Sequence, residues 1–302
     1  MIRVVLLVIA MHGLLLGQQT LDTSQLDLRQ RNLIHYGTIG TGVLYAGSMA
    51  VLGNAWYKDQ FSGNFKFFND AKEWGGMDKL GHLTTSWWIS AWLFDLQTAA
   101  RLPKRGSIIR SAVTAGMFMT TIEVFDGFSK GYGFSPYDML ANFAGIGSFC
   151  LQESLFNEQH FIHRYSYSET IHAQYRPQLL GNSLSERMLK NYNGQTYWVS
   201  FPVKLLIGKN SNFPPWLCLS AGHSISGFLG GDKNPESLNN MEFIYFDRIH
   251  QWKFSLDVDL SKLPFNSAFW KVFSSTFRWI KIPAPVLMFD RKRGLEFYPI
   301  RW

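Results

Sequence analysis

The sequence predicts an α+β protein, in which an N-terminal bundle of about four helices precedes an antiparallel β-rich half with one amphipathic helix. Three observations support this. Apolar and small residues recur at helical spacing through the first half, whereas residues 251–260 alternate strictly between apolar and polar. The 302 residues are 46% hydrophobic and 16% aromatic but only 17% charged. This composition supports a large core or a membrane contact, and it excludes a disordered chain.

Charge and cysteine content exclude two further classes of protein. The chain has 29 Lys and Arg against 22 Asp and Glu, a net charge of +7, which is too modest to indicate nucleic-acid binding. Two cysteines cannot form a disulfide scaffold in a chain of this length. Cys150 and Cys218 form either one disulfide or two buried thiols, and we favour thiols because Cys150 lies in an apolar helical pattern.

Residues 1–17 are predicted to be a signal peptide. Arg3 precedes an apolar run from Val4 to Leu16, and Gly17 follows as a small residue near a cleavage point. The run is shorter than the roughly 20 residues that span a bilayer. A retained anchor is the alternative, and in either case we expect an exported chain.

Residues 18–160 are predicted to form the helical domain. Its helices are expected at 33–53, 77–100, 107–125 and 136–155. Ser135 is a favourable N-cap residue, and Pro136 suits the first helical position. In an alternative arrangement, the helices at 83–100 and 107–125 span a membrane, although both segments carry acidic residues.

The remaining chain is predicted as a connection over 161–194 and an antiparallel β-rich region over 195–302. In the half-buried strand 251–260, Trp252, Phe254 and Leu256 share one face, and Lys253 and Asp257 share the other. Further strands are expected at 197–207, 216–228, 241–250, 286–289 and 295–302, with a hairpin turn at 290–294 and an amphipathic helix around 269–277.

Three consecutive predicted helices each carry two polar residues spaced to share one helix face. The pairs are Asp78 with His82, Glu123 with Asp126, and Asp138 with Asn142. If these faces meet, the six residues form one polar cluster. Buried carboxylates in such a cluster must be hydrogen-bonded, paired with Lys79 or His82, or bound to a cation.

Two interpretations of this cluster stay open. In a catalytic site, His82 would be an acid, base or nucleophile, with Glu123 and Asp138 orienting it or binding a metal. In a structural network, the same residues would fix helix register, and Asp138 would favour the start of its helix through the dipole. The chain has no zinc-protease, P-loop, serine-hydrolase or dinucleotide motif, so neither a metal nor a cofactor is selected.

The order of these motifs resembles the YfiM-like family of bacterial envelope proteins, described as predicted periplasmic lipoproteins. The resemblance covers about residues 75–155. It rests on Asp78-Lys79-x-x-His82, then Glu123-x-x-Asp126, then Ser135-x-x-Asp138-x-x-x-Asn142. It implies a cell-envelope location, in the periplasm and associated with the outer membrane, and it supports these residues as the site. The family has no established activity, so no reaction is implied.

The chain departs from that family in three respects. No cysteine follows the N-terminal apolar run, so the lipid-attachment residue of a lipoprotein is missing there. Asn142 stands where YfiM-like members often have Asp, which is similar to VanZ-like membrane proteins and implies an inner-membrane helical protein as the alternative. The added residues 156–302 resemble extended versions from the Bacteroidetes.

Two classes of function therefore remain. The protein is either an enzyme acting on a lipid or cell-wall component, or a non-enzymatic assembly or scaffolding subunit of an outer-membrane complex. Membrane lipid is the expected partner, with basic contacts at residues 101–110 and beyond Arg278. An envelope protein complex is the second expected partner, and nucleic acid is not expected.

Overall fold

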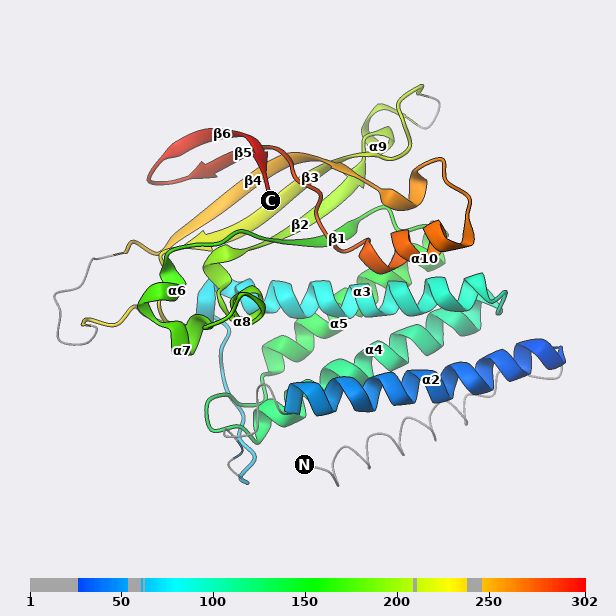
Figure 1. Ribbon diagram of the computed structural model, residues 1–302, viewed down its shortest axis with the longest axis horizontal. Helices are drawn as coiled ribbons and strands as arrows, with labels where there is room; N and C mark the ends of the chain where they lie inside the picture. The colour runs from blue at the N-terminus through cyan, green and yellow to red at the C-terminus, as the bar shows by residue number, and fades with distance from the viewer. Residues whose placement is uncertain (1–26, 54–60, 62, 209–210, 238–245) are drawn as a thin grey trace. The chain divides into compact units, whose positions relative to one another are not determined.

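The computed structural model describes residues 27–53, 61, 63–208, 211–237 and 246–302, so the predicted signal peptide lies outside the described residues. The chain divides into two compact units. Unit 1 comprises 1–70 with 85–155, and unit 2 comprises 71–84 with 156–302. Long helices occupy the first half of the chain and a six-stranded antiparallel sheet the second (Figure 1). The predicted fold class is confirmed.

Unit 1 is helical. It contains α2 (Leu28–Leu52), most of α3 (Met77–Ala99), α4 (Lys104–Gly127) and α5 (Pro136–Leu155). Helix α2 begins five residues before its predicted start because Asp27 forms a capping box. The Asp27 carboxylate accepts the Gln30 amide at 2.7 Å, and the Gln30 side chain accepts the Asp27 amide at 3.2 Å.

Polar and aromatic contacts join the helices of unit 1. Gln97 of α3 accepts a hydrogen bond from Arg110 Nε of α4 at 2.6 Å. The rings of Phe94 and Phe149 meet edge to face with centroids 5.6 Å apart. Among the described helices, α4 is long and apolar enough to cross a membrane by length and composition, criteria that a core helix also meets.

Helix α5 buries several polar residues and exposes several large apolar ones, although Phe149 is buried. Asp138, Asn142, Gln152 and Glu153 are buried, and Lys104 Nζ lies 3.2 Å from Glu153 Oε2. The exposed residues are Leu140, Phe143, Leu151 and Leu155. In a water-soluble domain, a helix normally buries its apolar face and exposes its polar one. Cys150 on this helix is half-buried and, like the buried Cys218, is a free thiol.

Unit 2 is built on a sheet whose spatial order follows the chain. The strands are β1 (Ile162–Tyr167), β2 (Gln195–Pro202), β3 (Leu217–Ser226), β4 (Ile249–Val258), β5 (Ala284–Asp290) and β6 (Gly294–Arg301), all antiparallel to their neighbours. The helices between them are α6 (His172–Tyr175), α7 (Pro177–Leu180), α8 (Leu184–Lys190), α9 (Lys204–Ile207) and α10 (Ala268–Phe277), with single turns η4 (Tyr192–Gly194) and η5 (Leu260–Lys262).

Several strand boundaries differ from the prediction. Strand β1 was not predicted, because its buried residues include Arg164 and Ser166 and its pattern is therefore not apolar. Residues 204–207 continue as helix α9 rather than as part of β2. Of the predicted strand 241–250, only the last two residues belong to β4, and 241–245 lie outside the described residues.

The hairpin turn at 290–294 is confirmed. Asp290 Oδ1 accepts the amides of Lys292 and Arg293 at 2.9 and 2.8 Å, and Gly294 has a positive φ of 74°. A side chain that accepts backbone amides two and three residues on is a common turn device, and glycine adopts positive φ without strain. Strands β5 and β6 are thereby held in register.

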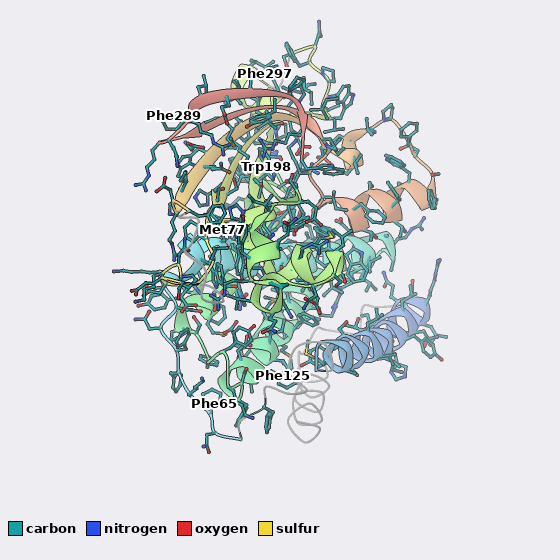
Figure 2. All side chains as sticks on the ribbon, turned by 60° about the vertical axis from the view of Figure 1, so that its left-hand side comes forward. Phe65, Met77, Phe125, Trp198, Phe289 and Phe297 are labelled. Atoms are coloured by element: carbon teal, nitrogen blue, oxygen red, sulfur yellow. The ribbon has the colours of Figure 1, made fainter. Side chains whose placement is uncertain are left out.

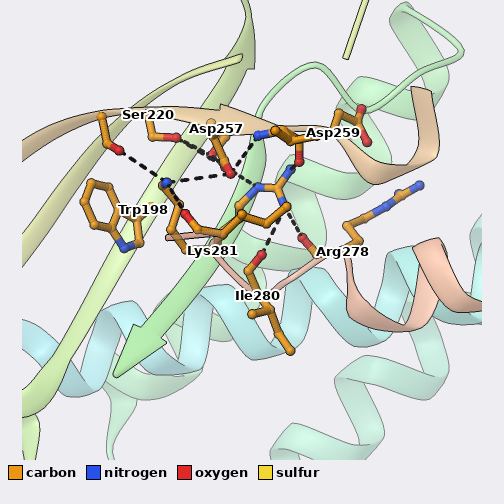
Figure 3. Close-up of polar contacts among 12 residues, drawn as sticks. Trp198, Ser220, Asp257, Asp259, Arg278, Ile280 and Lys281 are labelled. Carbon is orange, nitrogen blue, oxygen red and sulfur yellow. Dashed lines mark hydrogen bonds and ion pairs between the residues drawn. The ribbon is translucent and has the colours of Figure 1, made fainter. Parts of the chain in front are cut away.

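The alternation of 251–260 is confirmed as a strand, but its buried face is the polar one. Lys253, Ser255 and Asp257 are buried, whereas Trp252 and Phe254 are exposed. The buried face of the sheet carries an ionic network around Asp257 (Figure 3). We call the group formed by Asp257, Arg164 and Lys281 the Asp257 network.

The Asp257 carboxylate lies between two buried cations. Arg164 Nε is 2.7 Å and Lys281 Nζ is 3.7 Å from its oxygens, and all three side chains are at most 1% exposed. Ser200 and Ser220 donate to Asp257 Oδ2 at 2.5 and 3.3 Å. Buried charges are tolerated only when they are paired and hydrogen-bonded in this way.

Backbone carbonyls satisfy the remaining donors of the two cations. The Arg164 guanidinium donates to the carbonyls of Arg278 at 2.8 Å and Val258 at 3.1 Å. Lys281 Nζ donates to the carbonyls of Leu256 and Ile282, both at 2.8 Å. The network thus ties β1 to β4 and to the segment that leads into β5.

Candidate functional site

The first candidate residues lie at the start of α3, in unit 2. A single turn, η3 (Glu73–Gly76), precedes the helix, and Trp74 and Gly75 have positive φ values of 49° and 59°. This sharp turn sets the direction in which α3 begins. Met77, the first helical residue, is fully buried against Ile225 and Phe228, so the following turn of helix is fixed on the sheet.

Three side chains lie close to the Asp78 carboxylate. Tyr192 Oη donates to Asp78 Oδ1 at 2.7 Å, and Lys79 Nζ donates to Asp78 Oδ2 at 3.2 Å. His82 Nε2 lies 3.8 Å from Oδ1, within ion-pair range but beyond hydrogen-bond length. The side chains of Asp78 and His82 are 25% and 14% exposed. We call Asp78, Lys79, His82 and Tyr192 the Asp78 site.

The surroundings keep Asp78 ionised. Burial raises the pKa of its carboxyl group, but the charges of His82 and Lys79 and the hydrogen bond from Tyr192 outweigh this and hold the pKa below its ordinary value. Burial raises the pKa of the nearby Tyr197 well above its usual range, and Tyr165 and Asp78 add to this. Tyr197 therefore stays neutral and donates to Gln195 Oε1 at 2.9 Å.

Gly81 allows Tyr197 to approach α3 closely. A Cβ atom at position 81 would lie 2.9 Å from Tyr197 Oη, so a larger residue would displace the phenol or the helix. Neither Tyr192 nor Tyr197 is predicted as a site residue from the sequence. Both come from segments remote in sequence from α3, and no spacing rule connects them to Asp78.

The second candidate residues lie in unit 1 and meet at Ser135. Ser135 Oγ donates to Asp70 Oδ1 at 2.5 Å and accepts the Asp138 amide at 3.1 Å, which confirms the predicted N-cap of α5. The Ser135 amide donates to Glu123 Oε2 at 3.3 Å. Asp70 was not predicted, because it stands alone in a loop with no periodic pattern around it.

Asp138 and Asn142 share the buried face of α5 as predicted, with 4% and 2% of each residue exposed. Glu123 is buried on α4, and Asp126 is half-buried in the last turn of that helix. We call Asp70, Glu123, Ser135, Asp138 and Asn142 the Ser135 cluster. Its carboxylate and amide oxygens suit hard cations such as Ca²⁺ or Mg²⁺, whereas the Asp78 site combines an oxygen with an imidazole nitrogen, a pairing typical of Zn²⁺.

The predicted residues are divided between the two units. Asp78, Lys79 and His82 belong to one unit, and Glu123, Asp126, Asp138 and Asn142 to the other. The structure supports the predicted proximity of Asp78 and His82, and it buries both Asp138 and Asn142. A single cluster of the six residues from the three helix pairs stays a prediction.

A comparison with protein families identifies one match. Residues 65–154 match a family described as predicted periplasmic lipoprotein (DUF2279). The match includes all seven predicted site residues and agrees with the expected span of 75–155. It supports a periplasmic, cell-envelope location. The finer YfiM-like and VanZ-like assignments and the outer-membrane association stay predictions. No curated protein and no solved structure matches the chain.

Proposed function

We propose that the protein is a periplasmic envelope enzyme in which His82 is the general acid–base and Asp78 orients it, acting on a lipid or cell-wall component. The observation that carries this proposal is the Asp78 site. An ionised carboxylate with fixed partners lies 3.8 Å from an imidazole, and both groups are partly open to solvent. The family match supports the compartment.

The proposed roles follow from the chemistry of the groups. An imidazole takes up and releases protons near neutral pH, and a neighbouring carboxylate favours its charged form. Lys79 and Tyr192 hold the carboxylate oxygens in place. Glu123, Asp126, Asp138 and Asn142 belong to unit 1, where they are proposed to bind a cation, as acid and amide oxygens can do.

His82→Ala and Asp78→Asn test this proposal. Both variants are expected to lose the ability to rescue a deletion strain of the native host while unfolding within a few degrees of the wild type. His35→Ala is the matched control, since His35 is an exposed histidine on α2, and it should rescue fully. Full rescue by His82→Ala would contradict the proposal.

The Ser135 cluster favours a second candidate, a non-enzymatic assembly subunit. Ser135 connects α5 to Asp70 and to Glu123 of α4, an arrangement that would fix helix register whether or not catalysis occurs. Under this alternative, His82→Ala retains function, and Asp138→Asn loses stability and function together. Purification in detergent should then recover a stoichiometric envelope partner.

A further inference from the structure

The sheet of unit 2 has its apolar side chains on the outside over three consecutive strands. Trp252, Phe254 and Leu256 of β4, Leu287 and Phe289 of β5, and Leu295 and Phe297 of β6 are each between 43% and 69% exposed. Figure 2 labels Phe289 and Phe297 on the last two strands. Single exposed apolar residues are ordinary, but a contiguous face of this kind is not.

The register places these residues in two rows across the strands. Trp252 pairs with Phe289, which pairs with Leu295, and Phe254 pairs with Leu287, which pairs with Phe297. Side chains at paired positions point to the same face of a sheet. We call these six residues the outer apolar face.

The opposite face of the sheet explains why these apolar side chains cannot be buried in place of the polar ones. It carries the Asp257 network, in which both cations and the carboxylate are fully buried and hydrogen-bonded. A one-residue shift in register would expose that network and break it. The fold therefore keeps these apolar side chains on the outer surface, where their contact with water is unfavourable.

Helix α10 shows the same inversion within this unit. Ser274 and Ser275 are buried, whereas Phe269, Val272 and Phe277 are exposed. A helix with an exposed apolar face is typical of segments that lie in a membrane interface. The inversion thus occurs in both kinds of secondary structure and is not an accident of one strand pattern.

Charge next to the outer apolar face indicates what covers it. Arg291, Lys292 and Arg293 are exposed at the β5–β6 turn, directly beyond Phe289 and before Leu295. Lys292 pairs with Asp247 and Arg293 faces Glu296, while Arg291 donates to the Arg248 carbonyl. A cationic turn beside an apolar face complements anionic headgroups above acyl chains.

We infer that the outer apolar face is a membrane-binding surface, which places its side chains among the acyl chains of an anionic bilayer with the 291–293 turn at the headgroups. The inference concerns location and is independent of the acid–base role proposed for His82. A second copy of the chain is the competing occupant, and the test separates the two.

The test is flotation of the full chain with vesicles of phosphatidylcholine alone and mixed with phosphatidylglycerol in equal parts. The wild type should bind, and more tightly to the mixed vesicles. The double variant Phe254→Ser with Phe297→Ser should bind at least about tenfold more weakly. Its matched control is Leu184→Ser with Leu189→Ser on α8, because these leucines are 54% and 56% exposed in the same unit, and it should bind like the wild type.

Two further measurements test membrane binding by this face if the double variant folds poorly. Brominated acyl chains should quench wild-type tryptophan fluorescence more than that of Trp252→Phe, which keeps the apolar surface. Arg291→Gln should weaken binding to the mixed vesicles by up to about fivefold and leave phosphatidylcholine binding unchanged. Equal quenching in Trp252→Phe would overturn the inference, as would a dimer in lipid-free buffer that the double variant abolishes. His82→Ala should bind vesicles normally, so failure of one proposal does not imply failure of the other.

Discussion

The Asp257 network and the Asp78 site are both groups of charged side chains in unit 2, but they differ in access to water. The network has side chains at most 1% exposed, and every charge is matched by an ion pair or a carbonyl. The Asp78 site leaves 25% of Asp78 and 14% of His82 exposed, and its imidazole stands off the carboxylate. This contrast supports a structural role for the first group and the chemical role proposed for the second, because only the second of these two groups is partly open to solvent.

Removing the central carboxylate of the network should have the largest effect. Asp257→Ala leaves Arg164 and Lys281 buried without their counter-ion, and it is expected to cost about 3–5 kcal/mol of stability or to prevent folding. Asp247→Ala is the control, because Asp247 pairs with the exposed Lys292 and its loss should cost about 1 kcal/mol at most. Chemical denaturation of both variants measures the difference, and equal costs would refute the structural role.

Lys253 lies on the same buried face of the sheet as the Asp257 network. Replacing it tests whether burial of its charge lowers the stability of the fold. Its Nζ donates to Thr196 Oγ1 at 2.8 Å, and burial, helped by Arg301, lowers its pKa to about 7. Below pH 7 the folded state must bury the charge. As pH rises from there toward about 10, the folded state has lost the proton and the unfolded state still holds it, so stability rises.

Lys253→Met should therefore stabilise the protein on the order of 1–3 kcal/mol at pH 6. The gain should shrink as the pH approaches 10, and thermal unfolding across this range measures it. A gain that does not depend on pH would mean that folded Lys253 keeps its proton throughout this range, as the unfolded chain does, and would contradict the lowered pKa.

Ser135→Ala should have an intermediate effect. The change removes the N-cap of α5 and the partner of Asp70, at an expected cost of about 1–2 kcal/mol. Ser183→Ala removes a comparable cap, the 3.3 Å bond to the Glu186 amide on the short, exposed helix α8, and should cost less. If the two costs are equal, burial of the Ser135 cluster contributes nothing.

Asp78→Asn should have the smallest effect on stability. Because the folded pKa of Asp78 is lowered, the carboxylate stabilises the fold above the unfolded carboxyl pKa of about 4, and this contribution is lost as pH falls through the lower folded value. The variant should therefore differ from wild type at neutral pH and converge with it in acid. Tyr192→Phe should reproduce part of the difference, and a difference that grows in acid would contradict this account.

Much of the fold follows from short-range sequence patterns. The long helices, the Ser135 cap, the 290–294 turn and strand 251–260 depend on spacing and capping, which a single sequence displays. Strand β1 was missed because Arg164 is a buried residue of a type normally found at surfaces. The sequence also does not show that β4 buries its polar face, since a strand alternates with the same period whichever of its faces is buried.

The candidate site could be predicted only within one helix at a time. The spacing of four places Asp78 and His82 together, and the same spacing puts Asp138 and Asn142 on one buried face. Tyr192, Tyr197 and Asp70 reach their partners through tertiary structure. No local pattern encodes such contacts, so they were absent from the sequence-based site.

The most direct test of the assignment of chemistry to the Asp78 site compares His82→Gln with Asp257→Asn in one deletion strain and in one unfolding assay. The account predicts that His82→Gln unfolds within about 2 °C of the wild type, as expected away from buried networks, yet fails to rescue the strain. It predicts that Asp257→Asn loses function only in proportion to its loss of folded protein. Full rescue by His82→Gln, or a loss of stability as large as that of Asp257→Asn, would contradict the account.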